Sequence, residues 1–286
     1  MKEYSGMYPV KKMADVLQVS RSRYYSWVKK PWSIRTQRDN ELLGIIQTIH
    51  AEKRETYGSP RMHNEMKKKG QVCSKKRVAR IMRENGIYAR KKKRFKVTTD
   101  SGHQLPIAPN VLDRDFSVTS LNRVWVSDIT YIDTKEGWLY LCIILDLCSR
   151  KAVGWSMDSC MDATLVTSAL SMAVLHRTPP KELIFHSDRG VQYASKAFRK
   201  KLDENFMIQS MSRKGNCWDN ACAESFFSTL KNEEVFLQSY KTRNDARKRI
   251  FEYIAVFYNR QRSHSFLDYL SPEEFESDGT WIKYVA

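Results

Sequence analysis

The chain has 286 residues, of which 42% are hydrophobic and 12% aromatic, as in folded proteins with a sizeable core. It contains no apolar run of about 18 residues and no signal-peptide segment, which excludes a membrane-spanning or secreted protein and predicts a cytoplasmic one. The formal net charge is +17, and residues 1–100 hold 26 Lys and Arg against 9 Asp and Glu, whereas residues 101–286 hold 23 of each kind. This asymmetry predicts an arm that binds a polyanion, with nucleic acid as the favoured partner, attached to a neutral domain.

Residues 1–34 are expected to form a first helix-turn-helix. Apolar residues define one face of a helix that ends near Leu17, and Ser20 is a suitable cap for a second helix that starts at Arg21. Arg21 and Arg23 on this second helix would then enter the major groove of DNA. A pair of ordinary packed helices is the alternative reading of this segment.

Residues 35–90 are expected to form a second helix-turn-helix DNA-binding domain. An amphipathic helix over residues 35–53 is followed by a helix that starts near Pro60, and Ser74 is the predicted cap of a third helix. This third helix carries cations that are too dense for an ordinary solvated face, so we expect them to bind DNA. They are Lys75, Lys76, Arg77 and Arg80.

Residues 91–111 are basic and then polar, with little apolar periodicity. We expect a linker that lies along DNA phosphates and contacts them through its first cations. These are Lys91, Lys92, Lys93 and Arg94. The change in composition predicts a domain boundary near residue 112 and a second domain over residues 112–286.

This second domain alternates strand and helix patterns, which predicts an α/β fold. Three β-rich runs at 124–132, 138–146 and 151–157 are separated by short turns and are expected to form an antiparallel meander. Helices and two short strands follow, the first of which ends at Asp188, and a long helix over residues 242–259 comes near the end of the chain. The expected fold is therefore a mixed five-stranded sheet with helices, preceded by an all-α region.

Three acidic residues are the candidate catalytic centre. Asp128 lies inside a β-rich run, Asp188 ends a strand, and Glu224 lies in the first turns of a helix that Asp219 or Asn220 would cap. Three converging carboxylates suit Mg²⁺, with Mn²⁺ as a substitute, and two such ions would promote an in-line phosphoryl displacement. The sequence therefore predicts that the three acids bind two Mg²⁺ ions.

Other polar residues near these acids have competing interpretations. Lys231 lies two helical turns after Glu224, on the same face, where an ammonium group suits a DNA phosphate. Asp146 is expected to be a turn residue, and His186 to be hydrogen-bonded within the fold, because a metal would activate the nucleophile. For Arg260 and Arg262, contacts with DNA phosphates and a structural ion-pair network both remain open.

Four sequence motifs resemble those of a known family. They are WVSDITYI at 125–132, HSDRGVQY at 186–193, GNCWDNACAESFFSTLKNE at 215–233, and YNRQRSH at 258–264 with SPEEF at 271–275. In these motifs the chain resembles the transposase encoded by the downstream frame of bacterial insertion sequences of the third family, whose core is similar to retroviral integrase. The resemblance covers nearly the whole chain. It implies a ribonuclease-H-like core in which Asp128, Asp188 and Glu224 are the DDE acids and Lys231 touches the element's DNA end.

The activity implied by this resemblance is that of a DNA transposase. Such an enzyme binds terminal inverted repeats, hydrolyses an element end to free a 3′-OH, and joins that end to another phosphodiester without a covalent protein intermediate. The implied partners are double-stranded DNA, further copies of the chain and, as a candidate, the upstream-frame protein, all at the bacterial nucleoid. Two alternatives remain open, namely a non-cleaving regulator that binds terminal repeats and a ribonuclease-H-like nuclease or resolvase. Whether the chain is complete or the downstream part of a frameshift fusion is also open.

Overall fold

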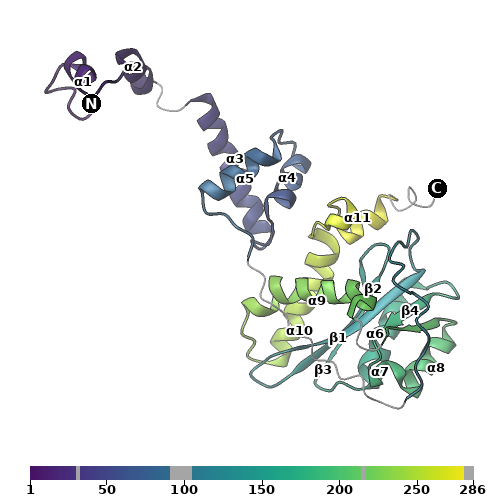
Figure 1. The fold of residues 1–286 in the computed structure, drawn as a ribbon. Helices are drawn as coiled ribbons and strands as arrows, with labels where there is room; N and C mark the ends of the chain where they lie inside the picture. The colour runs from purple at the N-terminus through teal and green to yellow at the C-terminus, as the bar shows by residue number, and fades with distance from the viewer. Residues whose placement is uncertain (30–32, 91–104, 214–216, 280–286) are drawn as a thin grey trace. The chain divides into compact units, whose positions relative to one another are not determined.

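The structure, a computed structural model, describes residues 1–29, 33–90, 105–213 and 217–279. The chain divides into two compact units, Met1–Ala89 and Arg90–Ala286, each with its own hydrophobic clusters (Figure 1). No helix in the described part of the chain is both long enough and apolar enough to cross a membrane. The predicted DNA contacts at Lys91, Lys92, Lys93 and Arg94 lie outside the described residues.

The regular elements of the first unit are helices, as the sequence predicts. They are α1 (Val10–Val16), α2 (Arg21–Lys29), α3 (Ile34–Glu52), α4 (Ser59–Lys68) and α5 (Lys75–Glu84). The hydroxyl groups of Ser33 and Ser74 cap α3 and α5 by accepting hydrogen bonds from backbone N–H groups in the first turn. Residues such as Leu42, Met62 and Ile81 join α3, α4 and α5 in one apolar cluster, so these helices form the expected second helical domain.

The second unit is built around a mixed sheet with the strand order β3-β2-β1-β4-β5. Its strands are β1 (Val124–Ile132), β2 (Leu139–Asp146), β3 (Ala152–Asp158), β4 (Ile184–Ser187) and β5 (Ile208–Met211). The first three form the expected antiparallel meander, whereas β4 pairs parallel with β1 and β5 pairs parallel with β4. This topology is the ribonuclease-H-like arrangement, which confirms the expected fold class.

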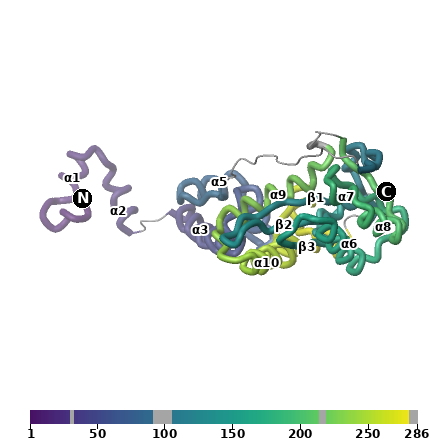
Figure 2. Tube along the Cα trace, turned by 90° about the horizontal axis from the view of Figure 1, so that it is seen from below, coloured from purple at the N-terminus to yellow at the C-terminus, as the bar shows by residue number. Residues whose placement is uncertain are grey.

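Helices cover both faces of this sheet (Figures 1 and 2). They are α6 (Ala163–Arg177), α7 (Val191–Ala194), α8 (Lys196–Glu204), α9 (Ala221–Glu233) and α10 (Arg243–Glu252). The last helix, α11 (Pro272–Ser277), packs against the segment that follows α10. Val124 and Val126 of β1 pack with α9 and α10, whereas Trp125 packs with α6 and α8 on the other face. Because side chains alternate along a strand, Asp128 belongs to the face that α9 covers.

The C-terminal helical segment differs from the single helix expected over residues 242–259. After α10 the backbone continues as π-helical turns over Tyr253–Gln261. The side-chain amide of Asn259 in this segment exchanges hydrogen bonds of 2.9 and 3.0 Å with the N–H and C=O of Ala152. The segment thereby protects the outer edge of β3, whose backbone groups would otherwise invite pairing with another strand.

The start of the second unit also differs from the expected boundary near residue 112. The N–H of Val111 donates to Oγ of Ser210 in β5 at 2.9 Å. Ala108 and Leu112 pack against the apolar clusters on the two faces of the sheet. Residues 108–111, which were expected to belong to the linker, are therefore part of the folded unit.

Candidate active site

The sheet brings Asp128 and Asp188 next to each other. Val126 in β1 is paired with His186 in β4, and each acid lies two residues further along its own chain segment. Asp128 lies within β1, whereas Asp188 directly follows β4, which ends at Ser187. Because β1 and β4 run parallel and neighbouring strands lie about 4.8 Å apart, their pairing brings the two residues near each other. The charge of Asp188 also raises the pKa of Asp128.

The turn after β4 holds the Asp188 side chain. Its Oδ1 accepts a hydrogen bond from the N–H of Gly190 at 2.9 Å. A Cβ atom on residue 190 would lie 3.0 Å from this oxygen and 3.0 Å from Oε1 of Gln192, which is too close for an ordinary contact. Glycine at this position therefore allows the backbone to approach the carboxylate.

Helix α9 carries Glu224 to the same region. Its start is joined to β1 because Nδ2 of the buried Asn220 donates to the carbonyl oxygen of Ser127 at 2.9 Å, directly before Asp128. The sequence suggested Asn220 only as a cap, yet its side chain makes no capping hydrogen bond. This link between helix and strand was missed because its two residues are 93 positions apart.

The surroundings of the candidate site shift the pKa values of two of its acids, Asp128 and Glu224. Burial raises the pKa of Asp128 well above its usual value, and the carboxylates of Asp188 and Glu224 raise it further. The N–H of Ile129 and the ammonium group of Lys231 act in the opposite direction. Burial also raises the pKa of Glu224. The structure thus places Asp188 and Glu224 close enough to Asp128 for their charges to act on it.

These acids do not form a compact three-ligand cluster. Among the residues that the structure describes, no three His, Cys, Asp or Glu side chains are close enough to hold a metal ion as they stand. Asp128 lies in β1, Asp188 lies in the turn after β4, and Glu224 lies in the first turn of α9. The three acids therefore come from three different elements around one region.

Lys231 is the nearest cation that the sequence predicted for this site. It is only 4% exposed, and its ammonium nitrogen lies 4.8 Å from the centre of the Tyr131 ring. Burial lowers its pKa to about 8, and the charge of Asp128 acts against this shift. Lys231 and Glu224 therefore both face β1, as their spacing of two helical turns predicts.

Two polar residues that competed for a catalytic role have structural partners. Asp146 is fully buried and accepts hydrogen bonds from the N–H groups of Cys148 and Ser149, both at 3.0 Å, as expected for a turn residue. His186 is also fully buried, and its Nδ1 lies 2.9 Å from Oγ of Ser210. Burial lowers the pKa of His186 to about 4, so this imidazole is neutral at physiological pH and supports the sheet.

Asp219 does not cap α9 and instead forms a buried ion-pair cluster. Its carboxylate is fully buried and accepts hydrogen bonds from the side chains of Arg213, Arg114 and Asn110. The Arg213 guanidinium in particular holds the pKa of Asp219 well below its usual range. Because Arg114 and Asp219 are 105 positions apart, no local sequence signal indicates the cluster.

Replacing Asp219 by Asn is expected to destabilise the second unit and reduce its acid sensitivity. Since folding lowers the pKa of Asp219, its ion pairs stabilise the protein above the unfolded value of about 4, and this contribution is lost as the pH falls below that value. The arginine side chains are 42% and 47% exposed. Solvent screening therefore limits the expected loss at neutral pH to about 2 kcal/mol of unfolding free energy.

Urea unfolding at a series of pH values measures this effect. Asp203→Asn is the matched control, because Asp203 is an exposed acid on α8. An Asp219→Asn variant with the same pH dependence as the unaltered protein would contradict the assignment.

The predicted DNA-binding residues of the first unit differ in their surroundings. Arg77 and Arg80 both pair with Asp39, at 2.7 and 2.6 Å, and so join α5 to α3. Their charges are partly neutralised by this pairing. Exposed cations are found at Arg21, Arg23, Lys75 and Lys76.

The two arginines of the C-terminal segment have different roles. Arg262 is 4% exposed and donates two hydrogen bonds of 2.7 Å to the carboxylate of Glu233 at the end of α9. Of the two alternatives left open for Arg262, the structure favours the structural network over a contact with DNA, because the guanidinium is already paired through two hydrogen bonds with Glu233. The Arg260 side chain is 64% exposed and lies 3.4 Å from Glu273, so it remains accessible.

Parts of the chain match models of known protein domains, and the chain as a whole is similar in sequence to known proteins. Models of the integrase core domain match residues 119–217 and 224–278, and a model of an HTH-like domain matches residues 37–95. The chain is 44% identical over 263 residues to the "Insertion element IS600 uncharacterized 31 kDa protein" of Shigella sonnei, covering 92% of this chain and 97% of that protein. It is 37% identical over 279 residues to "Transposase InsF for insertion sequence IS3A" of Escherichia coli (strain K12), covering 97% of each. The solved catalytic core domain of BIV integrase is 13% identical, with a TM-score of 0.42 over 57% of this chain and 99% of that one.

Proposed function

The chain belongs to the IS3 family of insertion-sequence transposases, and on that basis we propose that Asp128, Asp188 and Glu224 are its catalytic acids. With its integrase core and HTH-like domain, the chain is a DDE-type transposase that binds DNA. One observation supports this assignment of the acids above all. The parallel pairing of β1 with β4 brings Asp188, directly after β4, near Asp128, and the charges of both Asp188 and Glu224 raise the pKa of Asp128.

We infer that these three acids hold two Mg²⁺ ions, for which Mn²⁺ can substitute. Carboxylate oxygens are the ligands that these cations prefer, and the carboxylate of Asp188 is close enough to Asp128 to raise its pKa. The raised pKa of Asp128 indicates that surrounding groups compensate its negative charge poorly, as expected for a residue that binds a cation. Rotation about the side-chain bonds of Glu224 would add the third ligand. A bound divalent cation supplies charge stabilisation at the phosphate and makes water a better nucleophile.

The chain's own residues would then position the DNA for two successive displacements. In the first, water attacks the phosphodiester at the element end and a 3′-OH leaves; in the second, this 3′-OH attacks a phosphodiester of the target. No covalent protein intermediate is expected. We assign Lys231 to a phosphate beside the cleaved bond, because its ammonium group lies in the same region as Asp128. A bound phosphate would raise the pKa of Lys231 and keep it charged.

We further propose that the first unit, together with the basic residues that directly follow it, binds the terminal inverted repeats. The candidate contacts are Arg21, Arg23, Lys75, Lys76, Arg77, Arg80, Lys91, Lys92, Lys93 and Arg94. The exposed cations suit phosphate contacts, which supply most of the affinity for DNA. Two element ends must be brought together, so we expect a homo-oligomer on DNA, with the upstream-frame protein as a candidate partner.

An assay on DNA that carries the terminal inverted repeats tests this proposal. In Mg²⁺ or Mn²⁺ we expect cleavage that leaves a 3′-OH and joining of that end to a second DNA, whereas EDTA should suppress both products. DNA with scrambled repeats is the control. Binding without cleavage in Mg²⁺ would favour the regulator, and cleavage without joining would favour a nuclease or resolvase.

A further inference from the structure

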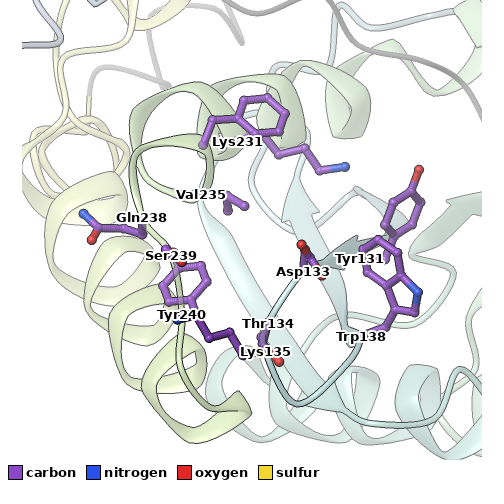
Figure 3. Close-up of a pocket in the computed structure, with 11 residues that line it drawn as sticks. Tyr131, Asp133, Thr134, Lys135, Trp138, Lys231, Val235, Gln238, Ser239 and Tyr240 are labelled. Carbon is purple, nitrogen blue, oxygen red and sulfur yellow. The ribbon is translucent and has the colours of Figure 1, made fainter.

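A second concave site, which we call the Trp138 pocket, lies next to the proposed catalytic acids. Its volume is about 500 Å³, which is within the range of ligand-binding sites. Its walls come from the end of β1, the β1–β2 turn, the end of α9 and the segment after α9 (Figure 3). The residues that matter here are Tyr131, Asp133, Lys135, Trp138, Lys231 and Phe236.

Aromatic side chains line this pocket without being buried in the core. Trp138 is 48% exposed and Phe236 is 39% exposed. The Trp138 ring meets the Tyr131 ring edge to face, with centroids 5.1 Å apart. Nε of Arg243 donates to the carbonyl oxygen of Trp138 at 3.0 Å, which holds the turn that carries this ring. A positioned, half-exposed ring offers a face on which a planar ligand can stack.

One lysine, Lys231, lines the Trp138 pocket and also lies close enough to Asp128 for its charge to act there. Figure 3 shows the Lys231 side chain extending from α9 toward Tyr131 and Trp138. The same ammonium group acts on the charge of Asp128, so the pocket and the acids share this lysine. Lys135 adds a second, exposed cation. Lysines beside accessible aromatic rings are the combination with which proteins bind unpaired nucleotides.

We propose that the Trp138 pocket receives an unpaired nucleobase of the DNA end, next to the phosphate on which the catalytic acids act. The inference rests on the proposed function. A base inside a duplex has both faces covered by its neighbours, so a base must leave the stack before it can lie on Trp138. Lys135 and Lys231 would contact the flanking phosphates, and Asp133 would accept a hydrogen bond from an exocyclic amino group.

The pocket would thereby keep the DNA end open beside Asp128. Unpairing a terminal base costs free energy, and stacking on an aromatic side chain offsets that cost. With the base held in the pocket, the adjacent phosphate is free to turn toward the proposed catalytic acids. This gives Trp138 a role in binding the open end.

Fluorescence of 2-aminopurine tests the proposal in the full chain without catalysis. The probes are a duplex with a short single-stranded overhang that carries 2-aminopurine, made in both polarities, and the same duplex with blunt ends, all in EDTA. We expect the protein to quench 2-aminopurine in at least one overhang, because the base stacks on Trp138. Trp138→Ala should lose this quenching and bind that overhang DNA about tenfold more weakly, with blunt DNA unaffected.

Three further variants make the result specific. Trp138→Phe keeps an aromatic face and should retain most of the quenching, whereas Phe236→Ala should lose part of it. Phe206→Ala is the matched control, because Phe206 is 61% exposed in the turn between α8 and β5 and should have no effect. Equal quenching by the unaltered protein and Trp138→Ala, or no quenching in either polarity, would overturn the proposal.

The cleavage assay and the 2-aminopurine assay together show whether the pocket proposal or the proposed catalytic function is wrong. If the unaltered protein cleaves terminal-repeat DNA in Mg²⁺ but shows no quenching that depends on Trp138, the pocket proposal alone is wrong. If quenching depends on Trp138 but no cleavage occurs in Mg²⁺, the pocket binds unpaired bases and the proposed catalysis is wrong. Asp128→Asn should retain the quenching in EDTA, because that residue lies outside the pocket.

Discussion

Replacement of Asp128 or Asp188 by Asn, or of Glu224 by Gln, should abolish both cleavage and joining while DNA binding is retained. Each substitution removes a negative charge, and with it a proposed metal ligand, at little change in side-chain volume. Because metal-ion catalysis supplies several kcal/mol of transition-state stabilisation, we expect rates to fall by about a thousandfold or more. The measurement compares the initial rates of 3′-OH formation and of strand joining with those of the unaltered chain.

Asp203→Asn is the control for this series, since it removes an exposed acid from α8. Binding to terminal-repeat DNA in EDTA should be the same for all of these variants, which separates catalysis from recognition. A variant that joins DNA ends at the unaltered rate would remove its residue from the catalytic set.

Replacement of Glu233 by Gln should cause the largest loss of stability among the substitutions considered. Glu233 receives two hydrogen bonds from Arg262 and one of 2.8 Å from the hydroxyl of Tyr253. Burial lowers the pKa of Arg262, but the carboxylate of Glu233 more than compensates and raises it above its usual range. Without this carboxylate a buried cation is left uncompensated, which costs about 3 kcal/mol and lowers the melting temperature by roughly 6–12 °C.

Thermal unfolding followed by circular dichroism measures this loss. Glu204→Gln is the matched control, because Glu204 forms an exposed pair with Lys200 at 3.8 Å and should contribute little. The double variant Glu233→Gln, Arg262→Met should recover part of the stability, because it also removes the buried cation. An unchanged melting temperature for Glu233→Gln would mean that solvent or other groups already compensate Arg262.

Helix α9 connects these two predictions. Asn220 joins the start of the helix to β1 beside Asp128, and Glu233 near its end is joined to Arg262. Glu224 and Lys231 lie between these two attachments. Glu224, the proposed third catalytic acid, and Lys231 are therefore held by contacts at both ends of one helix, which limits how far the backbone at these two residues moves relative to Asp128.

Much of the second unit could be predicted from local sequence. The three β-rich runs became β1, β2 and β3 within a residue or two of the expected limits, because strand propensity and turns are local properties. The placement of Asp188 at the end of β4 and of Glu224 near the start of α9 followed from the same kind of signal. What could not be predicted locally was the π-helical continuation of α10 and the pairing of Asn259 in that segment with Ala152, 107 positions away.

The sequence by itself determined which residue types stand at strand ends and helix starts, and hence the candidate acids Asp128, Asp188 and Glu224. Only the tertiary structure decided how the remaining charges are used. From the sequence Asp219 was a candidate helix cap and Arg262 a candidate for either a DNA contact or a structural network, but in the fold each is buried against a partner that is distant in the chain. The physical reason is that burial and ion pairing depend on contacts between elements that are distant in the chain. The local periodicity of a sequence does not indicate which distant elements are in contact.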